Sequence, residues 1–380
     1  MAVEGELIWL TLAKAPGVGR VRLAELMKAC PDPQDAWRLS AQELLQVERM
    51  GWQGALALVE VRTNSALRRQ AEREWAATQA AGLRILAIPD VDYPVRLLMT
   101  PDPPPYLFVD GPWQPDNRPT VAVVGTRKPT AYGLKVADRL GRELAEAGAV
   151  VISGMARGID SAAHRATLAA GGTTVAVLGG GADVVYPPES GALYKAIRGT
   201  GAVMSEQPPG TAPRPEHFPE RNRIISGLAD GILVVEAGER SGTLITVARA
   251  LEQGRDVFAV PGPITSPLSV GPNRLIREGA GLVTGAQDIL TALGCAALGY
   301  GREQLGPQFA GWRPAERPLP DGLTATEQQI LGWMGDTPHW PDDLAAGCGL
   351  PAAEVQSILT MLELHGLVRL LPGGEYVRRG

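Results

Sequence analysis

Cysteine is scarce in this 380-residue chain, which has three thiols, at Cys30, Cys295 and Cys348. They are odd in number, lie far apart and include no CxxC pair, so the sequence supports neither a disulfide framework nor a zinc site. No other metal-ligand set and no nucleophile triad stands out, so we expect no metal, no other cofactor and no catalytic chemistry.

Long apolar runs are also missing, since none approaches the roughly 18 residues of a membrane span. The N-terminus, MAVEGELIWLTLAK, has acidic residues before a brief apolar stretch, whereas a signal peptide has a basic flank and a longer apolar core. We therefore expect a cytoplasmic protein without a membrane partner.

The charges nearly balance, with 36 Lys and Arg against 41 Asp and Glu, a net charge of -5 and a pI of about 5.6. This balance excludes a strongly basic polyelectrolyte, so any nucleic-acid site must be a local patch. The length and the 45% hydrophobic content predict two or three globular domains with a large core.

Alternating strand and helix patterns fill the middle of the chain. GILVVEA (Gly231 to Ala237) reads as a buried parallel strand, a helix pattern follows over Thr243 to Leu251, and DVFAVPG (Asp256 to Gly262) reads as the next strand. The same order of strand, turn and helix recurs over residues 119–133, 149–172 and 173–190. These patterns predict an extended Rossmann-like, doubly wound and mostly parallel sheet whose loops meet at one edge.

Arginines, small residues and exposed backbone gather in the loops of that edge, and such groups hold phosphates. Arg127 offers a bidentate donor beside loop amides, and Phe218 is a candidate for stacking against a base, with Tyr132 and Tyr186 as weaker candidates. Asp160 is expected to cap the helix that follows it, with the orientation of an arginine as the alternative role. The predicted binding residues are Gly125, Thr126, Arg127, Lys128, Ser153, Gly154, Arg157, Gly158, Arg214, Phe218, Arg221, Asn222, Arg223, Ser241 and Gly242.

The motifs of two common enzyme classes on such sheets are missing. The first turn is GTRKPT rather than GxGxxG, and the Gly179-Gly180-Gly181 turn lacks the final glycine of that motif. No GxxxxGK[ST] is present either. Hydride transfer and P-loop hydrolysis are therefore not expected.

Two segments flank the sheet region. Residues 1–82 have helical periodicity, and the turn Pro16-Gly17-Val18-Gly19 resembles a helix-hairpin-helix turn, but we favour a plain turn between packed helices, since acidic residues nearly balance the basic ones here. Residues 296–322 read as a Gly/Pro-rich linker between a sheet domain at 83–295 and a terminal domain at 323–380. That last domain has three helix patterns and a hairpin turning at Gly373-Gly374, as in a winged helix.

The third helix of that domain, PAAEVQSILTMLEL, has no Lys or Arg. A recognition helix needs cationic or amide groups toward phosphates and base edges. We therefore expect this domain to pack or to contact protein rather than to read DNA.

Several long motifs in order resemble the DNA-processing protein A (DprA/Smf) family. They are VAVVGTRKPTAYG, SGMARGIDSAAH, LGGGADVVYPPE, FPERNRIISGLADGILVVEAGERSGTLIT, VFAVPGPI and GPNRLIREGA. The resemblance implies a homodimer that binds and protects single-stranded DNA without sequence preference. It also implies help in loading the recombinase RecA during natural transformation, recombination and repair, with single-strand-binding protein as a possible further partner.

Two alternatives stay open at this point. One is a nucleotide phosphoribohydrolase on a related fold, although the turn GERSGT replaces the PGGxGT turn and following glutamate of such enzymes. The other is a protein scaffold that binds no nucleic acid.

Overall fold

The computed structural model describes residues 2–114, 118–294, 323–334, 339–364, 367–370 and 375–378. The described chain forms two compact units, the first up to residue 294 and the second from residue 323. The predicted linker at 296–322 lies outside the described residues. The predicted boundaries after residues 82, 295 and 322 stay predictions.

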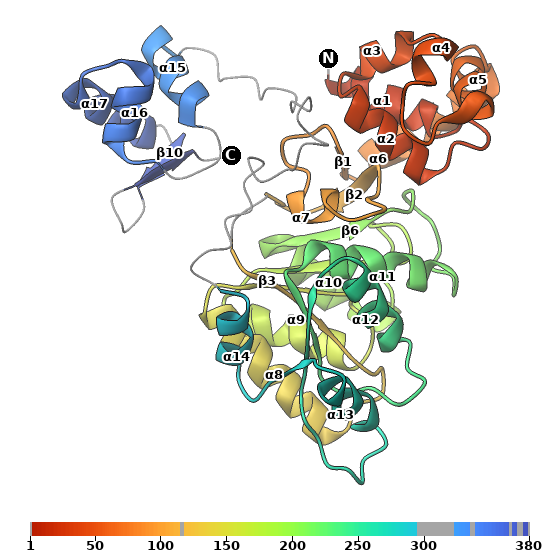
Figure 1. Ribbon diagram of the computed structural model, residues 1–380, viewed down its shortest axis with the longest axis vertical. Helices are drawn as coiled ribbons and strands as arrows, with labels where there is room; N and C mark the ends of the chain where they lie inside the picture. Colours follow the sequence, from red (N-terminus) through yellow and green to blue (C-terminus); the bar gives the residue numbers. More distant parts are fainter. Residues whose placement is uncertain are drawn as a thin grey trace. The chain divides into compact units, whose positions relative to one another are not determined.

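A nine-stranded sheet with the order β1-β2-β6-β5-β4-β3-β7-β8-β9 forms the centre of the first unit (Figure 1). Neighbours from β6 to β9 are parallel, whereas β2 pairs antiparallel with both β6 and β1. The mostly parallel sheet predicted from the sequence is thus confirmed. The strands are β1 Arg84–Ala87, β2 Tyr106–Asp110, β3 Thr120–Val124, β4 Val150–Ser153, β5 Thr174–Val177, β6 Ala202–Ser205, β7 Gly231–Val234, β8 Asp256–Ala259 and β9 Gly281–Leu282.

The apolar runs of the central strands follow from cover on both faces of the sheet. In β3, Val121 and Val123 belong to one buried cluster, whereas Ala122 and Val124 belong to another. Successive side chains of a strand point to opposite faces of the sheet. Because both faces are covered, all five residues of β3 are buried.

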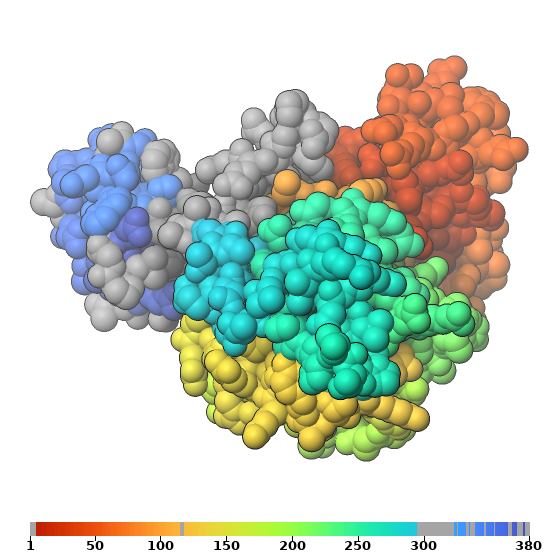
Figure 2. All heavy atoms as spheres, turned by 60° about the horizontal axis from the view of Figure 1, so that its bottom comes forward, coloured from red at the N-terminus to blue at the C-terminus, as the bar shows by residue number. Residues whose placement is uncertain are grey.

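Helices α8 (Ala131–Glu146), α9 (Ile159–Ala169) and α14 (Ala286–Ala292) cover the face that contains Val121. Figure 2 shows the cyan residues of α14 next to the yellow residues of α8, and there the Ala286 N–H donates to a Glu143 carboxylate oxygen at 2.8 Å. The opposite face packs against α11 (His217–Leu228) and α12 (Thr243–Glu252). Further helices are α7 Val95–Leu98, the 3-10 helix η1 Pro188–Ser190, α10 Gly191–Thr200 and α13 Val270–Arg277.

The N-terminal segment is helical, as predicted. Leu12, Leu23, Met27 and Leu58 are buried, and they share one apolar cluster with the α11 face of the sheet. The segment therefore belongs to the first unit. Its helices are α1 Ala2–Leu12, α2 Arg20–Ala29, α3 Pro33–Arg38, α4 Ala41–Leu44, α5 Gly51–Val61 and α6 Ser65–Ala80.

The second unit has the predicted winged-helix elements. They are α15 Ala325–Met334, α16 Pro341–Cys348, α17 Ala352–Leu364, and the antiparallel strands β10 Val368–Leu370 and β11 Tyr376–Arg378. A capping box starts α15, because Thr324 and Glu327 exchange side-chain and backbone hydrogen bonds. The predicted turn at Gly373-Gly374 lies outside the described residues.

A fully buried histidine ties α9 to the sheet. His164 Nδ1 lies 2.6 Å from the Thr174 hydroxyl, which donates to the Val151 carbonyl at 2.7 Å. The histidine is therefore the donor in the first bond. Burial, followed by the nearby positive charges of Arg221 and Arg165, lowers the pKa of His164 to about 3, so its ring is neutral at neutral pH.

This histidine makes stability depend on pH. In the unfolded chain a histidine has a pKa of about 6.5, so below that pH the unfolded state binds a proton that the folded state excludes. We expect the free energy of unfolding to fall by up to ~1.4 kcal/mol per pH unit below pH 6.5 through this residue. In His164→Gln that part of the slope should be lost.

Urea unfolding of both proteins at several pH values between 6.5 and 5 measures the two slopes, provided that their m-values agree. Parallel slopes would show that His164 is not the group responsible.

Candidate functional site

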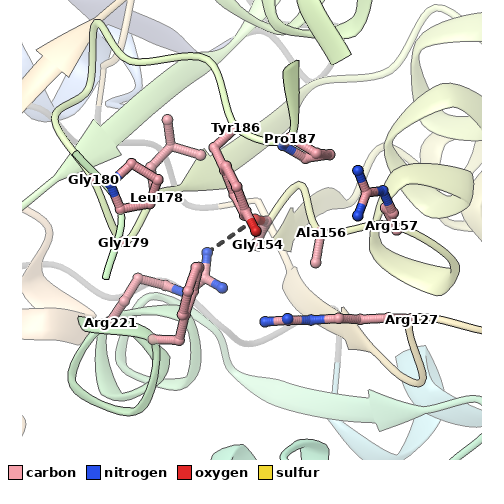
Figure 3. Close-up of a pocket in the computed structure, with 12 residues that line it drawn as sticks. Arg127, Gly154, Ala156, Arg157, Leu178, Gly179, Gly180, Tyr186, Pro187 and Arg221 are labelled. Atoms are coloured by element: carbon pink, nitrogen blue, oxygen red, sulfur yellow. Dashed lines mark hydrogen bonds between the residues drawn. The ribbon is translucent and has the colours of Figure 1, made fainter. Parts of the chain in front are cut away.

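A pocket opens at the carboxyl edge of the sheet, where the loops after β3, β4 and β5 meet the start of α11 (Figure 3). It holds about 430 Å³ of space free of protein atoms, part of which is open to solvent. Open α/β sheets bind their ligands at this edge. The pocket is lined by Arg127, Gly154, Ala156, Arg157, Leu178, Gly179, Gly180, Tyr186, Pro187, Pro213, Phe218 and Arg221.

The loop after β3 presents the Arg127 side chain rather than a row of free amides. Thr126 N–H donates to the Glu236 carbonyl at 2.8 Å, and Lys128 N–H donates to the Thr126 hydroxyl at 3.2 Å. These amides are thus used within the protein, contrary to the expectation that loop amides would hold a phosphate. Gly125 fits because an added Cβ would lie 2.6 Å from Ile159 Cγ1.

Glu236, two residues after the end of β7, holds that loop in place. Its carboxylate is buried and accepts the Thr130 N–H at 2.9 Å and the Thr130 hydroxyl at 2.6 Å. Together with the Thr126 bond, these contacts hold both ends of the segment that carries Arg127. Only the tertiary pairing of β3 with β7 brings Glu236 to Thr130, so no local sequence pattern assigns it this role.

The loop after β4 needs glycine at two positions. An added Cβ on Gly154 would lie 2.6 Å from the Arg221 guanidinium, and one on Gly158 would lie 2.3 Å from the Thr126 carbonyl. Gly158 also has a φ of +82°, which side-chain-bearing residues rarely adopt. Ser153 is fully buried and donates to the Val123 carbonyl at 2.6 Å, so its hydroxyl supports the sheet.

The prediction that Asp160 caps the following helix is wrong. Helix α9 starts at Ile159 without a side-chain cap, and Asp160 Oδ2 instead accepts the Gly154 N–H at 3.2 Å. Burial raises the pKa of Asp160 to about 6, although the nearby Arg221 charge opposes this shift. The carboxyl group therefore shapes the β4 loop and lies close to the charge of Arg221.

Arg221 forms the floor of the pocket and is only 6% exposed. Its Nη1 donates to the Gly154 carbonyl at 2.9 Å and also to the Val177 carbonyl. Burial lowers its pKa to about 10, with Asp160 opposing the shift and Arg127 adding to it. The group still carries its positive charge at neutral pH.

The Phe218 ring lies among cationic and aromatic groups. Arg127 Cζ is 5.1 Å and Arg221 Cζ 5.9 Å from the ring centroid, and the Tyr186 ring centroid is 5.8 Å away. Figure 3 shows the guanidinium groups of Arg127 and Arg221 pointing toward one another. Gly179 lets the ring approach, because an added Cβ would lie 3.1 Å from Phe218 Cδ1.

Of the predicted residues, the pocket contains Arg127, Gly154, Arg157, Phe218 and Arg221. The exposed Arg214 adjoins the lining residue Pro213, and Lys128 is exposed outside the lining. Asn222 accepts the Arg221 Nε–H at 3.3 Å and supports the floor. Ser241 binds Thr243 at the start of α12, and Gly242 precedes that helix, so both lie outside the pocket lining.

The position of Arg223 does not support its assignment to the binding site. Its side chain is 2% exposed, donates to both Glu206 carboxylate oxygens at 2.5 Å, and donates to the Asp102 carbonyl at 2.6 Å. The Nη1 and Nη2 groups of Arg223 thus serve contacts inside the protein. We therefore assign Arg223 a structural role.

Most of the apolar lining was not predicted from the sequence, and Tyr186 was only a weak candidate. Leu178, Gly179 and Gly180 directly follow β5, so the same edge rule that selected the other loops could have found them. Tyr186, Pro187 and Pro213 lie in irregular segments without such a signal. The other weak aromatic candidate, Tyr132, lies outside the lining and donates to the Pro261 carbonyl at 2.8 Å.

Within the described residues, no group of three or more His, Cys, Asp or Glu side chains is arranged to hold a metal ion. No helix in the same ranges is both long and apolar enough to cross a membrane.

Comparison with known proteins gave consistent matches. The profile of the family described as DNA recombination-mediator protein A matches residues 84–294, and that of the DprA winged helix domain matches residues 313–374. Protein Smf of Synechocystis sp. is 33% identical over 404 residues, covering 100% of both chains, and Protein Smf of Escherichia coli is 41% identical over 75% of each. An X-ray structure of DNA processing protein A from Streptococcus pneumoniae is 37% identical with a TM-score of 0.64, and the match covers 74% of this chain and 95% of that one.

Proposed function

Because this chain belongs to the DNA recombination-mediator protein A family, we propose that it is a recombination mediator that binds single-stranded DNA at the pocket described above. The observation that carries this proposal is the arrangement of Arg127 and Arg221 around the Phe218 ring. It combines cationic groups with an aromatic surface, as binding of single strands requires.

Phosphate binding is supported by the local charge. Arg127, Arg157 and Arg221 line the pocket, whereas no Asp or Glu does, in a chain whose net charge is -5. Arg127 is exposed and forms no salt bridge within the described residues. The Arg127 guanidinium is therefore available to bind a phosphate, and Arg221 adds a fixed positive charge at the floor of the pocket.

A preference for single strands is supported by the aromatic groups. The bases of a duplex stack on one another, but an unpaired base can stack on Phe218 or Tyr186. Indifference to sequence is supported by the kind of contact, because a phosphate held by arginine and a base stacked on an aromatic ring are the same for every nucleotide.

We propose direct DNA contacts for Arg127, Arg157, Arg214, Phe218 and Arg221. Lys128 and Asn222 then lie at the margin of the site, and Ser241 and Gly242 lie on the neighbouring loop. Gly125, Thr126, Ser153, Gly154 and Gly158 give the two loops their shape.

The remaining parts of the proposal rest on family membership alone. They are a homodimer, protection of the bound strand, delivery of that strand to RecA in transformation and repair, contact with single-strand-binding protein, and a cytoplasmic role without catalysis.

The first test compares two forms of one oligonucleotide. We expect the full chain to retard a single strand of roughly 30 nucleotides, which exceeds the ~4–16 nucleotides that one OB fold, a common single-strand-binding domain, covers. The annealed duplex should bind at least about tenfold more weakly, because its bases cannot stack on Phe218. Equal affinity for both forms would contradict the proposed role of the ring.

A second test concerns Arg127. Arg127→Ala should weaken single-strand binding by ~1.5–3 kcal/mol, the worth of a hydrogen bond to a charged group. The salt slope should also fall by about 0.7 for the lost phosphate contact. Lys128→Ala, which removes the neighbouring exposed charge outside the pocket lining, is the control and should cost clearly less. Equal losses in the two variants would mean that general charge, not the pocket, holds the strand.

A third test concerns the winged-helix unit. The segment from Glu327 to Glu363 has no Lys or Arg, and α17 offers Glu354 and Glu363. A chain ending at Pro320 should therefore keep its single-strand affinity within about tenfold in anisotropy titrations at fixed salt. A larger loss at unchanged oligomeric state would make this unit a principal DNA contact.

A further inference from the structure

Arg157, one of the three arginines that line the pocket, forms an ion pair with the Glu189 carboxylate. Arg157 Nε lies 2.5 Å from Glu189 Oε1, and Arg157 Nη2 lies 3.2 Å from Glu189 Oε2. The planar fork of the guanidinium thus faces both oxygens of one carboxylate, as it would face two oxygens of a phosphate. The side chains are 61% and 54% exposed, so the pair lies at the rim of the pocket.

Glu189 is held at this rim by the chain that forms the pocket wall. It lies in η1, directly after the lining residues Tyr186 and Pro187. The hydrogen bond from Arg157 lowers the pKa of Glu189, and the same bond raises the pKa of Arg157. Both groups are therefore charged at neutral pH.

The other two arginines of the lining differ from Arg157. Arg127 forms no salt bridge within the described residues, and Arg221 donates to backbone carbonyls on the pocket floor. Figure 3 shows Arg157 and Arg127 on the same side of the pocket. A strand that contacts Arg127 would therefore meet the Arg157 fork while Glu189 still holds it.

We propose that Glu189 competes with DNA phosphate for Arg157 and so limits the affinity of the pocket. An exposed ion pair contributes little to folding, and it opens at small cost. Glu189 is thus a residue that sets affinity without contacting the ligand itself, and this inference rests on the proposed function.

The test begins with Glu189→Gln, which keeps the size of the side chain and removes its charge. We expect single-strand binding about two- to fivefold tighter at low salt, in keeping with the small worth of an exposed ion pair. The gain should shrink as salt is raised, because it is electrostatic. Anisotropy titrations with the same oligonucleotide at several salt concentrations measure both effects.

A matched control separates this effect from the change in net charge. Glu252 pairs with Arg249 at 2.7 Å on α12, both side chains are exposed, and neither lines the pocket. Glu252→Gln therefore frees an arginine elsewhere and changes the net charge equally. Its affinity should match that of the unmodified chain.

The double variant Arg157→Ala, Glu189→Gln decides the mechanism. If Glu189 acts by holding Arg157, its removal should give no gain over Arg157→Ala alone. A gain that persists without Arg157 would show plain repulsion of the strand and would overturn the competition. No gain from Glu189→Gln, in a folded variant of a chain that does bind DNA, would also overturn it. Failure of the unmodified chain to bind any single strand would instead refute the proposed function, and this inference with it.

Discussion

The site depends on the burial of one charged group, the Arg221 guanidinium, which needs hydrogen-bond acceptors and an opposite charge around it. A buried charge is costly unless hydrogen-bond acceptors and an opposite charge surround it. The carbonyls of Gly154 and Val177 supply the acceptors, and Asp160 supplies the charge. These groups come from the ends of β4 and β5 and from the first turn of α9, so Arg221 joins α11 to three other elements. Gly154 has no side chain because the guanidinium takes up that space.

The buried polar groups of this site hold its loops in place, and its exposed side chains are free to contact a ligand. Glu236 holds both ends of the loop that carries Arg127, and the buried Arg221 lies beside Phe218. The result is a rigid base under exposed side chains, which favours recognition because little ordering remains to be done on binding. Arg157 is exposed and is paired with the Glu189 carboxylate. A change at this ion pair would therefore alter the affinity for DNA without disturbing the buried base of the site.

The sequence predicted the sheet and the position of the pocket well, because uninterrupted apolar runs mark buried parallel strands and ligands bind at their carboxyl ends. Arg127, Phe218 and Arg221 follow from that rule. It failed for Arg223, since residues two apart on a helix point about 200° apart, and burial of Arg221 toward the pocket turns Arg223 away from it. The bonds that use the Thr126 amide, and the role of Glu236, depend on pairing between strands far apart in the chain. No local pattern reports such pairing.

The central claim is that the strand lies against the Phe218 ring, and photochemical cross-linking tests it most directly. A single strand carrying 5-iododeoxyuridine would be irradiated with the full chain, and the linked peptides identified by mass spectrometry. The account predicts links at Phe218 or Tyr186, the two aromatic residues of the pocket lining. Links found only in residues 1–82 or in the winged-helix unit would contradict it.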